Sequence, residues 1–265
     1  MTLEKIKVVM DKEFDEIIKN KLILGSLLFV PLLFAVLMPV TMIAPSVFYP
    51  DTYQTGNSTF TGNLFGGGVP SQDALIIFFM SAVIPFFMML PTILPTIIAS
   101  YSVIGEKKNR TLEPLLAAPV TVYDILVGKA LSAIIPGLLA TWVSSLLFFG
   151  ISEGIIYIGL HRLIVPDVAM WGVGLLLLAP LLAFFGIMMA LIISSRVSDP
   201  RVAQQISAIF IIPIMALFIG QLSGVLLISI QVILILAVVL LVIDALVLRF
   251  ARSMFDREEI LTRWK

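Results

Sequence analysis

The chain has 265 residues, of which 60% are hydrophobic and 13% are charged, a composition that excludes an ordinary soluble domain and predicts a membrane protein. The 17 basic and 17 acidic residues balance, so no overall field draws the chain to nucleic acid. The sequence contains no cysteine, which excludes disulfides, thiolate metal sites and a cysteine nucleophile.

Residues 1–21 predict an amphipathic helix along the inner membrane interface. Its apolar residues recur at helical spacing, with lysines and acids around the other side. These apolar residues are Leu3, Ile6, Met10, Phe14 and Ile17. The pattern is compatible with a simple anchor and with a lever joined to the first span.

The apolar runs that follow predict six membrane-spanning helices. A spanning helix needs about 20 mostly apolar residues to cross a hydrocarbon core of roughly 30 Å. The last uncharged run is about twice that length, and Gly220, Gln221, Ser223 and Gly224 near its midpoint predict a hairpin. The predicted spans are residues 22–44, 74–104, 130–151, 168–193, 202–220 and 224–248.

Lysine and arginine positions predict that both termini lie in the cytoplasm. Short loops rich in these residues stay on the cytoplasmic side. With the amino terminus inside, the six predicted spans leave only Arg162 outside. The predicted fold class is therefore an all-α, polytopic membrane protein with six transmembrane helices. Residues 45–73, which contain no lysine or arginine, form its first extracellular loop.

Residues 106–119 predict a short cytoplasmic helix between spans two and three. Asn109 or Thr111 caps its start, Glu113 favours its amino end, and Pro119 ends it. Its apolar face consists of Leu112, Leu115 and Leu116. An apolar face between charged flanks either docks in a groove of a partner or rests on lipid headgroups.

A second helix start follows directly. Thr121 and Asp124 form a capping-box pattern ahead of Ile125 and Leu126. We expect this start to open the helix that becomes span three.

This loop resembles the signature segment of ABC type-2 transporter permeases, near the sodium and drug exporter branch. The similar residues are Glu106, Arg110-Thr111-Leu112-Glu113-Pro114-Leu115-Leu116-Ala117-Ala118-Pro119-Val120, Ile125-Leu126-Val127-Gly128-Lys129 and, before span five, Ser198-Asp199-Pro200-Arg201. Arg110 stands where many members have glycine. The amphipathic start and the six spans fit the same family.

The resemblance implies that residues 106–119 are a coupling helix received by a cytoplasmic ATPase subunit. The residues expected to dock on that subunit are Glu106, Arg110, Thr111, Leu112, Glu113, Leu115, Leu116 and Pro119. It also implies two permease copies, identical or different, together with two ATPase subunits. The expected function is the multi-pass permease subunit of an exporter in the cell membrane, with a hydrophobic or amphipathic substrate, or an ion, as cargo.

The nucleotide site is expected on the partner. No Gly-x-x-x-x-Gly-Lys-Ser/Thr motif occurs, and no soluble segment is long enough for a nucleotide-binding domain. We therefore expect no cofactor and no catalytic residue on this chain, with ATP and Mg²⁺ on the ATPase.

Polar residues inside the predicted spans offer little further chemistry. Asp244 lies about one turn from Arg249, which favours snorkelling or a local ion pair over a functional role. Gln204, Gln205 and Gln231 either line a pathway or bond between helices. The single His161 and the isolated Asp244 make no metal or protease site.

Two other classes of function are alternatives to an ABC permease. A self-sufficient secondary transporter or an intramembrane enzyme would need acids or paired catalytic groups near the bilayer midplane, and the sequence places none there. A membrane anchor for a cytosolic partner would use the docking helix without any transport pathway.

Overall fold

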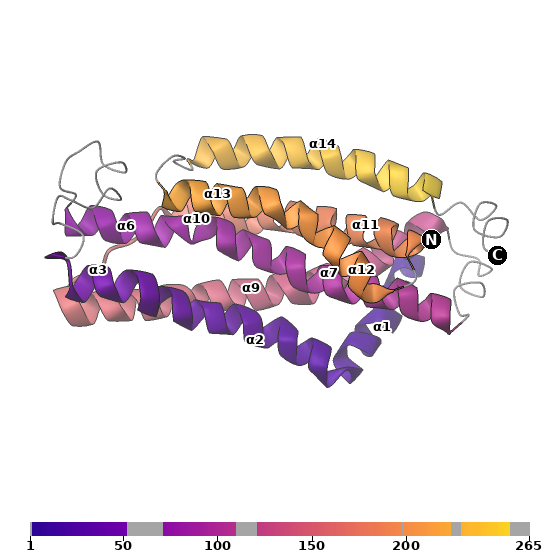
Figure 1. Cartoon of the computed structure of the whole chain (residues 1–265), viewed down its shortest axis with the longest axis horizontal. Coiled ribbons are helices and arrows are strands. Elements are labelled where there is room, and N and C mark those ends of the chain that lie inside the picture. Colours follow the sequence, from indigo (N-terminus) through magenta and orange to yellow (C-terminus); the bar gives the residue numbers. More distant parts are fainter. Residues whose placement is uncertain (1, 52–70, 110–120, 198, 224–228, 255–265) are drawn as a thin grey trace.

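The computed structural model describes residues 2–51, 71–109, 121–197, 199–223 and 229–254, and these residues form helices without any strand (Figure 1). The helices are α1 (Thr2–Lys19), α2 (Lys21–Met38), the π-helix η1 (Pro39–Ile43), α3 (Ala44–Phe48), α6 (Gln72–Ala82), α7 (Ile84–Lys108), α9 (Val122–Leu160), α10 (Val168–Val173), the π-helix η2 (Gly174–Leu178), α11 (Ala179–Arg196), α12 (Pro200–Ala208), the 3-10 helix η3 (Ile209–Ile211), α13 (Ile212–Leu222) and α14 (Ile230–Met254).

Six helical segments are long and apolar enough to cross a membrane, which confirms the predicted number. They are Leu24–Phe48, Gln72–Glu106, Tyr123–Leu160, Val168–Arg196, Arg201–Leu222 and Ile230–Ala251. The last two are separate helices, as the predicted hairpin requires. The third segment is longer than the predicted 130–151, because helix α9 continues through polar residues at both ends.

The second spanning segment forms the centre of the bundle. In its most apolar window 83% of the residues are buried, compared with 17% in each of the last two segments. Helix α7 packs against α9, α11, α12 and α13, whereas α14 runs along one side of the bundle (Figure 1). The outer surfaces of α13 and α14 are therefore open to lipid or to another subunit.

Glycines on the neighbouring helices allow close packing on α7. A Cβ at Gly137 of α9 would lie 2.6 Å from the Pro95 side chain, and one at Gly186 of α11 would meet the Thr92 side chain. Larger residues at these two positions would push the helices apart.

Helix α1 lies across one end of the bundle and meets α2 at a sharp bend (Figure 1). We call this the α1 end; α7 ends there, and so does α14. The face of α1 that is buried against the protein carries Val9, Glu13 and Ile17, whereas Leu3, which the pattern placed on the apolar face, is 80% exposed. Helix α1 and the last residues of α14 thus lie at the same end of the bundle, as an even number of spans requires.

Candidate functional site

A largely buried cluster of charged and polar side chains joins α1 to α7 and α9 at the α1 end, with one exposed member, Lys12. Its members come from three helices: Lys12 and Glu13 from α1, Ser102 and Glu106 from α7, and Lys129 from α9. We call this set the α1 charge cluster. Its longest-range contact, between Lys129 and Glu13, joins residues that are 116 positions apart in the chain.

Lys129 lies at the centre of the cluster. Its ammonium donates to Glu13 Oε1 at 2.6 Å and to Ser102 Oγ at 2.6 Å, and its Nζ lies 2.9 Å from Glu106 Oε1. The Lys129 side chain is only 3% exposed, and those of Glu13 and Glu106 are 5% and 8% exposed. Two of its N–H donors have acceptors in Glu13 and Ser102, and the ion pair with Glu106 adds a second opposite charge, so the buried charge is compensated.

The other members complete the network. Lys12 Nζ lies 2.9 Å from Glu106 Oε1 and 3.4 Å from Glu13 Oε1. Ser102 donates its hydroxyl hydrogen to Glu13 Oε2 at 2.7 Å. The charges of the two lysines and the two glutamates cancel, so the cluster has no net charge.

The cluster changes the acidity of its members on α1. Burial alone would raise the pKa of Glu13, but the charge of Lys129, together with hydrogen bonds from Lys129 and Ser102, lowers that pKa below its ordinary value. Burial would likewise lower the pKa of Lys12, but the hydrogen bond and charge of Glu106 raise it. Both groups are therefore held in their charged forms at neutral pH.

Helical spacing and one glycine explain why α1 reaches the cluster. Val9, Glu13 and Ile17 recur every four residues and so share one face of α1. That face packs on α9 at Gly128, where a Cβ would lie 2.8 Å from the Cβ of Val9 and 3.1 Å from the carbonyl oxygen of Ile6. The absence of a side chain at Gly128 therefore lets the two backbones approach.

The cluster contains the first residue of the predicted coupling segment, Glu106, and a residue that follows the segment in the chain, Lys129. Glu106 is near the end of α7, and Lys129 follows the start of α9. The capping box that opens α9 is confirmed: Asp124 N donates to Thr121 Oγ1 at 3.2 Å, and Thr121 N donates to Asp124 Oδ2 at 2.9 Å. The helix entering the segment and the helix leaving it are thus both joined to α1.

The predicted docking residues fall mostly outside the described part of the chain. These are Arg110, Thr111, Leu112, Glu113, Leu115, Leu116 and Pro119. Glu106 is described, and it is 7% exposed, with its Oε1 directed at Lys12 and Lys129. This carboxylate therefore serves the contact with α1, and its docking on an ATPase stays a prediction.

The polar residues predicted inside the spans do not form one site. Gln205 of α12 and Gln231 of α14 are exposed, and Gln204 is partly buried. Asp244 is buried at 6% exposure, and among the described residues no ion pair joins it to Arg249, unlike the expected local pair. Their roles as pathway residues stay predictions.

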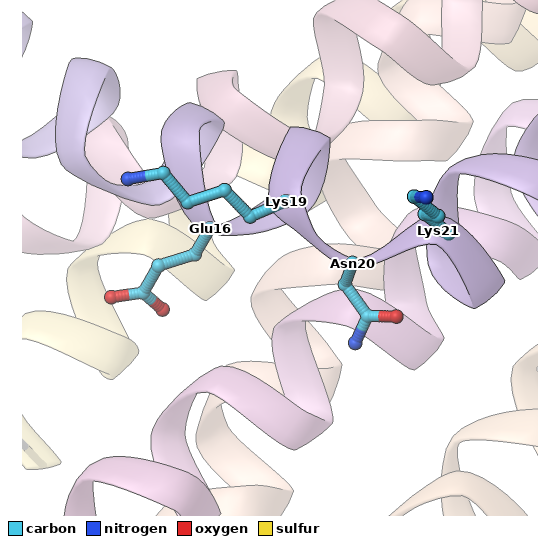
Figure 2. A pocket seen from close by; sticks show the side chains of 4 residues that line it. All are labelled: Glu16, Lys19, Asn20 and Lys21. Carbon is cyan, nitrogen blue, oxygen red and sulfur yellow. The ribbon is translucent and has the colours of Figure 1, made fainter.

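A shallow hollow marks the bend between α1 and α2. It has a volume of about 560 Å³ and is lined by Glu16, Lys19, Asn20 and Lys21 (Figure 2). Figure 2 shows the two lysines on either side of Asn20, where α1 ends and α2 begins. This polar lining suits the level of lipid headgroups, where an interfacial helix turns into a span.

The sequence reasoning did not assign Lys12, Glu13, Ser102 or Lys129 to a site. Two signals were present. Glu13 falls on the same helical face as Val9 and Ile17, and Lys129 interrupts the apolar run that opens span three. A charge on an apolar face calls for a buried partner, but neither pattern says which helix supplies it.

A comparison with protein families identifies the class of this chain. The model of the family described as ABC-2 family transporter protein matches residues 7–231. The chain belongs to the ABC-2 transporter family. The matched range contains every member of the α1 charge cluster. No curated protein matches the chain. This ABC-2 family member is therefore a multi-pass membrane protein and a permease subunit of an ABC transporter.

Proposed function

We propose that this ABC-2 permease couples ATP hydrolysis by a separate cytoplasmic subunit to the export of a hydrophobic or amphipathic substrate, or of an ion. Two permease copies, identical or different, would combine with two ATPase subunits that bind ATP and Mg²⁺. Residues 106–119 would be the coupling helix. The family match and the Thr-Leu-Glu-Pro-Leu-Leu segment support this assignment.

The α1 charge cluster is the observation that carries the coupling proposal. Lys129 ties α9 both to Glu13 of α1 and to Glu106 of α7. A push on residues 110–120 therefore acts on three helices that are joined by buried ion pairs. This geometry favours the lever interpretation of the first helix over the simple anchor.

The lever extends into the first span. Only Asn20 separates α1 from α2, and α2 also packs along α9. We infer that nucleotide-driven closure of the ATPase subunits moves residues 106–119 and the α1 end together, and that α2, α7 and α9 reorient as a group. Packed helices of this kind move as rigid bodies on the microsecond to millisecond scale.

Reconstitution with the ATPase subunit tests this function. The full permease is placed in lipid vesicles with a candidate ABC ATPase subunit, and its stimulation of ATP hydrolysis is compared with that of Glu113→Ala and Leu115→Asp. We expect both variants to span the membrane but to lose ATPase binding and stimulation. The control is Arg162→Met, which removes an exposed ion pair with Asp73 at the opposite end of the bundle.

The control variant should stimulate hydrolysis as the native chain does. If the native chain neither binds nor stimulates an ATPase, the exporter proposal fails. If it binds and stimulates but Leu115→Asp does so equally, the coupling segment has been assigned to the wrong residues.

A further inference from the structure

Asp244 is a buried acid of the last helix without a partner among the described residues. Its side chain is 6% exposed, and neither carboxyl oxygen makes a hydrogen bond there. It shares a face of α14 with Ile233, Ala237 and Ala251, all of them buried. This face packs on α11, α10 and η2. The carboxyl group therefore points into the seam between α14 and the bundle, and away from lipid.

The helices that form this seam supply no counter-charge. Helix α10 and η2 contain no charged residue, and Arg196, the one charged residue of α11, is exposed at its final position. Arg249 of α14 is exposed as well. Because five residues turn a helix by about 140° beyond a full turn, Arg249 lies on another side from Asp244.

Helix α9 also contacts α14, but its charged side chains interact with groups other than Asp244. Lys129 is occupied in the α1 charge cluster, and Asp124 caps the start of its own helix. Glu153 accepts a hydrogen bond from the backbone of Ile164 at 3.3 Å. None of these groups neutralises Asp244 in the described structure.

The depth of Asp244 makes this arrangement informative. At 1.5 Å per residue it lies about 21 Å along α14 from Ile230 and about 10 Å before Ala251, so it is within the spanning segment. A carboxylate at that depth is costly unless something neutralises it, and such acids typically bind or relay cations. A neutral side chain would pack the seam at lower cost, so the acid calls for a ligand.

We propose that Asp244 is a proton-binding group in the α11–α14 seam, and that its carboxyl takes up and releases a proton. Binding neutralises the carboxyl and lets α14 stay packed on α11. Release leaves a charge that must reach water or another partner, which loosens the seam. This inference does not depend on the coupling role of residues 106–119.

Carbodiimide labelling of the permease alone tests the site. The full chain in lipid nanodiscs is treated with dicyclohexylcarbodiimide, which reacts with protonated carboxyl groups in apolar surroundings, and peptide mass spectrometry measures the modification of Asp244. We expect Asp244 to label at least tenfold faster than the exposed Asp73 and more slowly as the pH rises. Replacing choline chloride by sodium or potassium chloride at constant pH is the control: labelling should not change, and protection by the metal ion would contradict a proton site.

A second measurement uses the isosteric variant Asp244→Asn. Above the acid range in which Glu13 titrates, the melting temperature of the native chain should change with pH, and that of Asp244→Asn should change less. The proposal is overturned if Asp244 does not label in the folded chain. It is also overturned if neither labelling nor melting temperature responds to pH. Neither assay contains an ATPase, so a negative result leaves the proposed function in place.

Discussion

Replacing Lys129 by methionine keeps an unbranched side chain that is one atom shorter, but removes the charge at the centre of the α1 charge cluster. Glu13 loses a contact of 2.6 Å and Glu106 one of 2.9 Å, and both carboxylates stay buried. Removing one partner of a buried ion pair costs about 3–5 kcal/mol. We take the lower limit, because Lys12 still lies 2.9 Å from Glu106 and supplies part of the compensation.

Hydrogen exchange of the α1 amides measures this loss. A cost of about 3 kcal/mol corresponds to a roughly 100-fold loss of protection if α1 opens locally. The matched control is Lys19→Met on the same helix, because the Lys19–Asp15 pair is 3.7 Å long and both side chains are more than two-thirds exposed. An exposed pair of this kind contributes little, so we expect less than a threefold change.

A second substitution tests whether the loss of protection comes from the uncompensated charge or from the changed shape of the side chain at position 129. Glu13→Gln in the Lys129→Met background removes one stranded carboxylate and should recover more than half of the lost protection. Equal exchange of α1 in Lys129→Met and Lys19→Met would refute the reasoning. So would a double variant that is worse than Lys129→Met alone.

Three further predictions concern the same end of the bundle. Because the pKa of Glu13 is lowered, its ion pairing stabilises the docking of α1 at pH values above the ordinary pKa of 4.5, and this stabilisation is lost as the pH falls below 4.5. The protection of the α1 amides from hydrogen exchange should therefore fall only in acid. A Glu13→Gln chain with the same acid response would contradict this. Gly128→Ala places a Cβ 2.8 Å from the Cβ and 2.9 Å from the Cγ1 of Val9 and should lower stability by about 2 kcal/mol; thermal unfolding should show a smaller loss when the same change is made in a Val9→Gly chain, which lacks both atoms, and an equal loss there would locate the clash elsewhere. Thr121→Val removes the cap of α9 and should cost about 1 kcal/mol, seen as roughly fivefold faster exchange at residues 122–125; unchanged exchange there would show that the cap is dispensable.

The spanning helices were predictable because lipid imposes length and hydrophobicity on each one separately. The hairpin after Gly220 followed from the length of the last apolar run, and the capping box at Thr121 from spacing alone. The bounds of α9 were not predictable from hydropathy, because its first turns contain Asp124 and Lys129. Both side chains are buried, and the partners of Lys129 lie on other helices.

The α1 charge cluster was not predictable from the sequence either, because its members meet through contacts between helices. Charge counting placed Lys12 and Lys129 on the same side of the membrane, but it did not say that Lys129 meets Glu13, 116 residues away. That pairing depends on the crossing of α1 over α9 at Gly128, which is a tertiary contact. Glu106, by contrast, was singled out through a family resemblance that assigned it to docking, whereas the structure places it against α1.

The decisive measurement is the ATPase stimulation of the reconstituted complex carrying Lys129→Met, with Lys19→Met beside it. If the cluster transmits motion between the ATPase and the spans, Lys129→Met will still bind the ATPase, but its stimulation of hydrolysis will fall at least tenfold, and Lys19→Met will match the native chain. If α1 is released in Lys129→Met and stimulation nevertheless stays at the native level, the α1 charge cluster holds the fold together but does not couple it to ATP hydrolysis.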